Sequence, residues 1–370
     1  MSSNRALPTK QRMTRFDTSD RITINLTPDM GIKAPQNPLI AIDNGSLYEK
    51  VAMLTTVGDG TSIVIEKMLN FIAEQERGKS RVRSGGNSSV KGSLEVTYRG
   101  RTYFTDRKGA SLGGTSGLHG DKMERLTLRV LFALTLLGLG NGEEIDLSIT
   151  TFFTPGQFKA QEQSAKKQLS QPLSWSTPSG RKSAIIKTLQ IYPEGYHLGF
   201  YRQFSTPENP GITGDWAARY DIGYRTFLCD FVDPDGFFDD DRSRSFDGKG
   251  TSLFYQWVAE EAGIDNPEDP QFIAAVNSGA STYRPQGAFE DIPIADAIET
   301  AHEWYVGELS DLANDCTPPE IESSVIGGGG AYRFGKDLLT QLRGSDRYVC
   351  DEPDIANVVA QTVKMARELK

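Results

Sequence analysis

The sequence predicts an α/β protein in which helices cover β-sheets. Apolar runs of strand length alternate with longer segments whose apolar side chains recur at helical spacing. The chain also falls into two similar halves, and each half carries an Asp-x-Gly turn at the end of a strand-like run. At 370 residues, the chain is long enough for two domains or for one domain split into lobes.

Composition indicates an ordinary soluble globular protein, with 38% hydrophobic and 24% charged residues. The net charge of −9 argues against broad binding to nucleic acid, so we expect no direct nucleic-acid partner. Three widely spaced cysteines (Cys229, Cys316 and Cys350) favour a reducing compartment and a cytoplasmic location. The longest apolar segment, 130–139, is too short to cross a bilayer, and the N-terminus lacks the apolar core of a signal peptide, so we expect no membrane partner.

The order of the expected elements starts with a polar region. Residues 1–37 show no sustained periodicity, which predicts a flexible N-terminal extension with at most one short strand, at 21–26. Apolar runs predict strands or hairpins over 39–42, 51–54, 94–104, 145–153, 182–192, 218–232 and 324–326, and a strand or short helix over 61–72. Helical spacing predicts helices over 121–138, 252–262, 294–312, 332–343 and 354–368. The Gly-, Ser- and Arg-rich residues 79–91 are expected to form an exposed loop.

The first glycine turn lies within residues 39–50, LIAIDNGSLYEK. Asp-Asn-Gly between two apolar runs predicts a tight hairpin, because Asn and Gly tolerate positive φ. Such a turn exposes successive backbone N–H groups, which can form a nest for an anion. Asp43 offers a carboxylate for a hydrated cation, and Lys50 offers a positive charge for phosphate. A plain hairpin with a solvated lysine is the alternative.

Two further glycine turns follow later in the chain: Asp221-Ile222-Gly223, and Gly327 to Gly330 between a strand and a helix. Two Asp-x-Gly turns that face each other can hold the phosphates of a nucleotide, with Asp43 and Asp221 ordering the waters of one Mg²⁺. An all-glycine turn lets the backbone lie flat against a purine and its ribose. Phosphoryl transfer also needs an oriented water, and Glu194, on a turn after a strand, is placed for that task unless it is a plain turn residue.

In this order the motifs resemble those of the actin-like ATPase superfamily, and more narrowly those of the ParM-type plasmid-segregation proteins. The first phosphate motif of that family is similar to Asp43 to Lys50, and the second is similar to YDIGYRTFLCDF at Asp221, Gly223 and Thr226. The other matches are the strand that ends in a proline turn (144–158), the Pro-Glu-Gly segment (191–200), the adenosine motif VIGGGGAYRF (325–334) and the closing Ala356-Asn357 pair. The resemblance spans residues 38–370.

The resemblance implies a ribonuclease H-like duplicated, two-lobe fold with a central nucleotide cleft. Lobe I would comprise residues 38–215, lobe II residues 216–345, and residues 346–370 would form a C-terminal helix that returns to lobe I. It also implies an ATPase that uses ATP and ADP, with GTP as the other candidate nucleotide, together with Mg²⁺. Further implications are head-to-tail filaments of the chain itself and a DNA-bound adaptor protein for plasmid segregation.

The same resemblance gives individual residues their expected roles. Asp43 and Asp221 would hold Mg²⁺ through water, and Glu194 would support hydrolysis. The expected nucleotide contacts are Asn44, Gly45, Ser46, Lys50, Gly223, Tyr224, Arg225, Thr226, Gly250, Gly327, Gly328, Gly329, Gly330 and Tyr332.

The second phosphate motif departs from the family pattern. Tyr224 and Arg225 stand where the family has small residues, and Leu228 stands near the place of a usual aspartate, with Asp230 two residues later. These departures leave open a nucleotide-binding structural protein that polymerises but hydrolyses poorly. A small-molecule kinase of the same superfamily is the other alternative, with Asp215 or Asp230 as its catalytic base.

Overall fold

The chain forms two compact units in the computed structural model. The structure describes residues 13–17, 21–45, 47–57, 60–75, 94–112, 115–116, 125–151, 158–205, 217–233, 237–344 and 346–369. The first unit comprises Met1–Gly211 and Asn357–Lys370, and the second comprises Ile212–Ala356. Both units contain strands and helices, so the predicted α/β class is confirmed.

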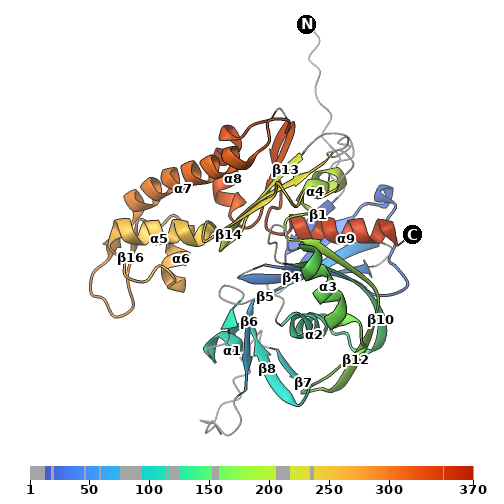
Figure 1. Ribbon diagram of the computed structural model, residues 1–370. Helices are drawn as coiled ribbons and strands as arrows, with labels where there is room; N and C mark the ends of the chain where they lie inside the picture. The colour runs from blue at the N-terminus through green and yellow to red at the C-terminus, as the bar shows by residue number, and fades with distance from the viewer. Residues whose placement is uncertain are drawn as a thin grey trace. The chain divides into compact units, whose positions relative to one another are not determined.

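The first unit is built on a sheet of 12 strands in the order β1-β2-β5-β4-β3-β10-β12-β11-β7-β8-β6-β9 (Figure 1). Its strands are β1 (Met13–Asp17), β2 (Ile22–Leu26), β3 (Leu39–Asn44), β4 (Tyr48–Val57), β5 (Gly60–Leu69), β6 (Phe71–Glu74), β7 (Glu95–Tyr98), β8 (Arg101–Thr105), β9 (Thr115–Ser116), β10 (Asn141–Thr151), β11 (Leu173–Thr177) and β12 (Gly180–Pro193). Strands β3, β10 and β12 run parallel, so their carboxyl ends lie at one edge of the sheet.

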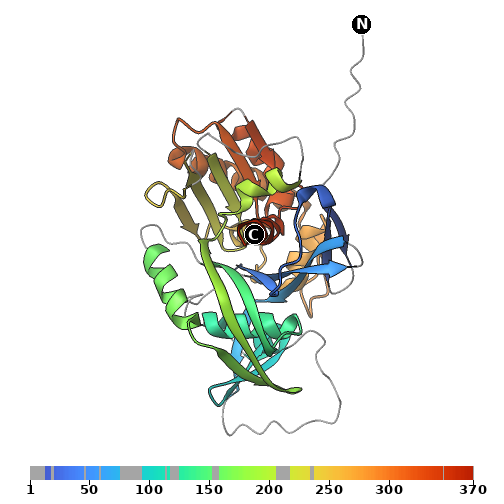
Figure 2. The same ribbon diagram turned by 90° about the vertical axis from the view of Figure 1, so that its right-hand side faces the viewer.

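Helices cover this sheet. They are the 3-10 helix η1 (Pro28–Met30), α1 (Asp106–Ser111), α2 (Leu126–Leu136), α3 (Phe158–Leu169), α4 (Leu198–Ser205) and α9 (Ala356–Glu368). Both views show α2 beside the long strands β10 and β12 (Figures 1 and 2). Buried α2 side chains such as Phe132 share one core with Ile145 and Leu147 of β10, which explains the apolar character of this helix.

The second unit has a five-stranded sheet in the order β15-β14-β13-β18-β19 and a small β16–β17 ribbon. Its strands are β13 (Ala217–Ile222), β14 (Thr226–Val232), β15 (Arg244–Asp247), β16 (Thr282–Tyr283), β17 (Ile292–Pro293), β18 (Ser323–Gly327) and β19 (Asp346–Val349). Its helices are α5 (Thr251–Ala262), α6 (Pro270–Asn277), α7 (Ala295–Cys316) and α8 (Ala331–Gln341). Aromatic side chains from the sheet and from all four of these helices contribute to the core, among them Tyr220, Phe254, Phe272, Tyr305 and Phe334.

The same arrangement of five strands occurs in both units. The order β5-β4-β3-β10-β12 in the first unit corresponds to β15-β14-β13-β18-β19 in the second. In chain order, the first three strands of each set pair antiparallel, with the second strand between the first and the third. The fourth strand pairs parallel with the first, and the fifth pairs parallel with the fourth. Asp43 and Asp221 are each the fifth residue of the first strand of this repeat. The two similar halves of the sequence therefore correspond to two copies of this five-strand arrangement.

Most predicted elements are confirmed, and residues 61–72 form strands rather than a helix. The helix predicted over 121–138 is α2, whose first expected residues, 121–124, lie outside the described residues, as does the loop expected at 79–91. Helix α3 was not predicted because only Ala165 and Leu169 of its side chains are buried, so it has no apolar stripe to detect.

The two ends of the chain differ from expectation. The predicted strand at 21–26 exists as β2, but it pairs with β5 inside the large sheet, so it is not part of a flexible extension. The reason is its alternation: Ile22, Ile24 and Leu26 are all buried. Residues 346–349 form β19 beside β18 in the second unit, and the last helix begins only at Ala356. Within the described part of the chain, no helix is long and apolar enough to cross a membrane.

Candidate functional site

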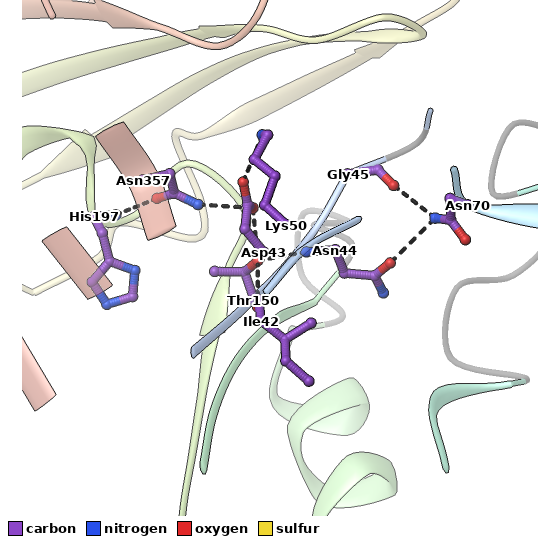
Figure 3. A network of polar contacts seen from close by, with 9 residues as sticks. All are labelled: Ile42, Asp43, Asn44, Gly45, Lys50, Asn70, Thr150, His197 and Asn357. Atoms are coloured by element: carbon purple, nitrogen blue, oxygen red, sulfur yellow. Dashed lines mark hydrogen bonds and ion pairs between the residues drawn. The ribbon is translucent and has the colours of Figure 1, made fainter. Parts of the chain in front are cut away.

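Asp43 lies near the carboxyl end of β3, next to Thr150 of β10 in the sheet register. Asp43 is 4% exposed, and its carboxylate is held by three side chains (Figure 3). Lys50 Nζ lies 2.9 Å from Oδ2, and both Thr150 Oγ1 and Asn357 Nδ2 donate to Oδ1 at 3.0 Å. A carboxylate with this many charge-assisted contacts has a fixed position and orientation.

The protonation of Asp43 follows from these contacts. Burial alone would raise the pKa of Asp43, because it removes water from the charged form. The charge of Lys50 and the hydrogen bonds from Lys50, Asn357 and Thr150 outweigh burial, and the pKa lies below its ordinary value of 3.8. Asp43 is therefore ionised at neutral pH, as a ligand of hydrated cations must be.

Two further groups reach this edge of the first unit. Asn357, in the first turn of α9, accepts a hydrogen bond from the backbone N–H of His197 at 3.1 Å (Figure 3). Glu194 follows β12 directly, and its backbone N–H donates to the carbonyl of Thr151 at 3.0 Å. The segment that carries the proposed catalytic glutamate therefore lies at the carboxyl ends of the same parallel strands as Asp43.

The turn after Asp43 is held by backbone and side-chain hydrogen bonds. Asn44 N–H donates to Thr150 Oγ1 at 3.2 Å, and Gly45 N–H donates to the carbonyl of Asp43 at 3.0 Å. Asn70 Nδ2 donates to the carbonyl of Gly45 at 2.7 Å. Ser46, the expected phosphate ligand of this turn, lies outside the described residues.

In the second unit, Asp221 lies beside Gly327 in the register of the parallel strands β13 and β18. The next residue, Gly328, has φ +84°, and a Cβ there would overlap Asp221 Oδ1 and lie 2.6 Å from the carbonyl oxygen of Ile222. The Gly330 N–H donates to that same carbonyl at 2.9 Å. The second and third glycine turns are therefore in direct contact, and the contact requires glycine at position 328.

The turn after Asp221 also contacts the start of α5. Gly223 N–H donates to the carbonyl of Thr226 at 3.0 Å, which closes the hairpin, and Thr251 N–H donates to the carbonyl of Gly223 at 2.9 Å. A Cβ on Gly250 would overlap the carbonyl oxygen of Tyr224. Gly250, an expected nucleotide contact, and the start of α5 are thus joined to the second phosphate motif.

The residues that depart from the family pattern have structural partners. Arg225 forms a two-pronged ion pair with Asp247, at 2.5 and 2.6 Å. The ring of Tyr224 lies 6.3 Å from that of Tyr255, and burial raises the pKa of Tyr224 to about 12. Tyr332, which is an expected nucleotide contact and not one of these departures, donates its hydroxyl to Asp354 Oδ1 at 2.8 Å.

Sequence patterns alone missed part of this site. Nothing in the sequence marks Thr150 or Asn70 as partners of the first turn, because only the fold brings them to Asp43 and Gly45. The sequence indicates Asn357 only through its match to the family, and the fold shows that its side chain donates to Asp43. Leu228 is a buried strand residue, and Asp230 lies fully buried opposite Arg219, whereas Asp215 lies outside the described residues.

Each unit by itself offers chemistry that suits a nucleotide with Mg²⁺. Asp43 in the first unit and Asp221 in the second are both carboxylates, the kind of oxygen donor that Mg²⁺ prefers. A Cβ placed on Gly329 would have no atom within 4 Å, so the backbone is open on that side. An open glycine backbone next to a carboxylate permits the close approach of a sugar or a flat base.

Similarity to proteins of known structure shows which fold this chain has. No family model matches the chain, and no curated protein matches it. ParM of Bacillus thuringiensis, solved with ATP, matches with a TM-score of 0.63 at 13% identity, over 90% of this chain and 100% of that one. The ParM filament of Clostridium botulinum matches with a TM-score of 0.62 at 15% identity, again over 90% and 100%. An archaeal actin homologue in complex with ADP matches with a TM-score of 0.64 at 20% identity, over 90% and 99%.

The chain therefore has an actin-like α/β fold. Within that class, its fold is of the ParM type, which confirms the fold and the resemblance predicted from the sequence. At identities of this size the similarity concerns the fold, and the activity has to be argued from the residues.

Proposed function

We propose that this protein is an actin-like ATPase that binds ATP with Mg²⁺ and assembles into nucleotide-dependent filaments. The observation that carries the proposal is the meeting of Asp221, the Gly223 turn, Gly250 and the Gly327–Gly330 bend at one end of the second unit's sheet. Asp43 occupies the equivalent place in the first unit. The fold is one in which other proteins have been solved with ATP and with ADP.

The proposed chemistry uses the residues as follows. Asp43 and Asp221 would hold Mg²⁺ through water, and the bound metal would neutralise phosphate charge. Lys50 and Thr226 contact phosphates, and the glycine bend receives the adenosine. Lys50 is paired with Asp43 in this structure, so phosphate binding would share its ammonium between two anions. Glu194 orients the attacking water as a hydrogen-bond acceptor.

Filament formation would follow from head-to-tail contacts between different faces of the chain, because such contacts do not close unless the rotation allows it. A filament controlled by ATP could move a plasmid through a DNA-bound adaptor. The match to a ParM filament supports this part of the proposal through the fold alone.

Two assays on purified protein test the function. With ATP and Mg²⁺, we expect light scattering to rise and the protein to pellet, and we expect phosphate to be released without any added acceptor. Assembly that ADP supports equally well would contradict nucleotide control. Phosphate transfer only when a sugar or carboxylate acceptor is added would favour the kinase alternative, for which Asp230 is poorly placed because it is fully buried.

Glu194→Ala tests the catalytic assignment. We expect phosphate release to fall by roughly 100-fold or more, because the attacking water loses its hydrogen-bond acceptor. ATP affinity should stay within a factor of about three, since Glu194 contributes no proposed phosphate contact. Equilibrium binding of a fluorescent ATP analogue and a phosphate-release assay separate the two effects. Glu162→Ala on the exposed face of α3 is the control, and unchanged turnover in Glu194→Ala would remove this residue from the mechanism.

A further inference from the structure

A buried polar network lies behind the turn that follows Asp43, on residues with no role in the chemistry above. It consists of Glu49 on β4, Asn70 between β5 and β6, and Arg129 on α2. These three residues are 1%, 3% and 5% exposed, respectively. Removing a charged pair from water costs free energy, and apolar residues of similar volume often stabilise a fold equally well, so a buried pair by itself is weak evidence for a role in stability.

Asn70 is the residue of this network that touches the turn. Its Nδ2 donates to the carbonyl of Gly45 at 2.7 Å and approaches Asn44 Oδ1 at 3.5 Å (Figure 3). Its backbone N–H donates to the carbonyl of Leu47 at 2.9 Å. One asparagine therefore contacts three residues of the turn, from a chain segment 25 residues away from Gly45.

Arg129 fixes which way the amide of Asn70 points. Arg129 Nη1 donates to Asn70 Oδ1 and lies 3.4 Å from Glu49 Oε2. Because a guanidinium has donors only, the amide oxygen must face Arg129 and the NH₂ group must face the turn. The carbonyl of Gly45 has acceptors only, so it also requires the NH₂ group on its side. This chemistry sets the direction of the hydrogen bond from Arg129 to Asn70 and of the one from Asn70 to the carbonyl of Gly45.

We propose that Asn70, oriented by Arg129, is a positioning residue that holds the Asn44–Gly45 turn in the form that receives phosphate. The proposal rests on the nucleotide site proposed above. Binding free energies are linked reciprocally, so phosphate that stabilises the turn also stabilises the Asn70–Arg129 contacts to the same extent. The proposal therefore implies that nucleotide binding stabilises α2.

Asn70→Asp separates the two sides of this residue. The aspartate keeps the volume and the acceptor for Arg129, but at pH 8 it offers no donor to the carbonyl of Gly45. We expect ATP affinity to fall by about tenfold or more, while the melting temperature without nucleotide changes by only a few degrees. Asn25→Asp on β2 is the control for the chemical change, because the amide oxygen of the exposed Asn25 accepts from Ser62 Oγ at 2.8 Å and the residue lies on another strand than the turn. Its ATP affinity should equal that of the wild type.

Hydrogen exchange on the wild type tests the link without any substitution. We expect saturating ATP analogue to slow amide exchange in residues 126–136 of α2, and the same analogue at saturation to have less effect on α2 in Asn70→Asp. If the wild type binds nucleotide but α2 exchange is unchanged and Asn70→Asp binds as tightly, the positioning role is wrong while the proposed function stands. If the wild type binds no nucleotide, the proposed function fails, and this inference fails with it.

Discussion

Gly328→Ala is expected to lower the free energy of unfolding by roughly 2–5 kcal/mol and to abolish measurable nucleotide binding. Gly328 has φ +84°, where an L-residue costs about 1–2 kcal/mol. The added Cβ would also overlap Asp221 Oδ1 and press on the carbonyl of Ile222, and such overpacking costs about 1–3 kcal/mol. Relief of this overlap moves the proposed metal ligand. Urea denaturation followed by circular dichroism measures the first effect, and titration with a fluorescent ATP analogue measures the second.

The neighbouring glycine provides the control. Gly329 has a backbone that L-residues adopt, and a Cβ there meets no atom within 4 Å. Gly329→Ala should leave the free energy of unfolding unchanged or raise it by about 0.5 kcal/mol, because alanine restricts the unfolded chain. Equal free energies of unfolding for the two variants would mean that a Cβ at position 328 does not press on Asp221. Weakened ATP binding in Gly329→Ala, with no loss of stability, would show that the nucleotide uses the open side of the bend.

The sequence predicts the fold well where a strand or helix buries one continuous face. The hairpin of β3 and β4, the strand pair of β13 and β14, and helices α5 and α7 all carry such patterns. Segments with little buried apolar surface were missed, such as α3, with two buried side chains. The place of β2 in the sheet was missed for another reason: its alternating pattern identifies a strand but not the strand it pairs with.

The sequence likewise predicts one part of the candidate site and misses another. Turn chemistry in the sequence identifies Asp43, Asp221 and the glycines, because few residue types tolerate these backbone conformations and close approaches. The partners of these residues come from distant segments. Asn357 lies 314 residues from Asp43 in the chain, and Thr150 lies 107 residues away. Sequence spacing carries no information on such contacts, which arise only when parallel strands and the last helix are assembled.

Asp43→Asn is expected to destabilise the protein by about 2–4 kcal/mol and to lower phosphate release by on the order of 100-fold. The substitution preserves shape but removes the carboxylate that pairs with the ammonium of Lys50, 17% exposed, and breaking a largely buried pair costs on this scale. The amide oxygen of the new asparagine can still accept from Thr150 and Asn357, and its NH₂ group then faces the ammonium of Lys50, where donor meets donor. Loss of a group that orders the metal's waters typically costs 10–100-fold in activity. Asp146→Asn is the matched control, since Asp146 is a buried aspartate of neighbouring β10 whose carboxylate accepts from Asn37 at 3.3 Å.

The stability difference between the wild type and Asp43→Asn should depend on pH, and that dependence identifies the cause of the difference. The pKa of Asp43 in the folded protein lies below the ordinary value of 3.8, so ionised Asp43 stabilises the folded state at every pH above the unfolded pKa. The stability gap between wild type and Asp43→Asn should therefore be constant above pH 5 or so and should narrow as pH falls through about 4 towards the folded pKa. Urea denaturation at a series of pH values measures the gap. A gap that persists unchanged down to pH 2 would assign the loss to packing, because protonated Asp43 would then contribute as much as the carboxylate paired with Lys50.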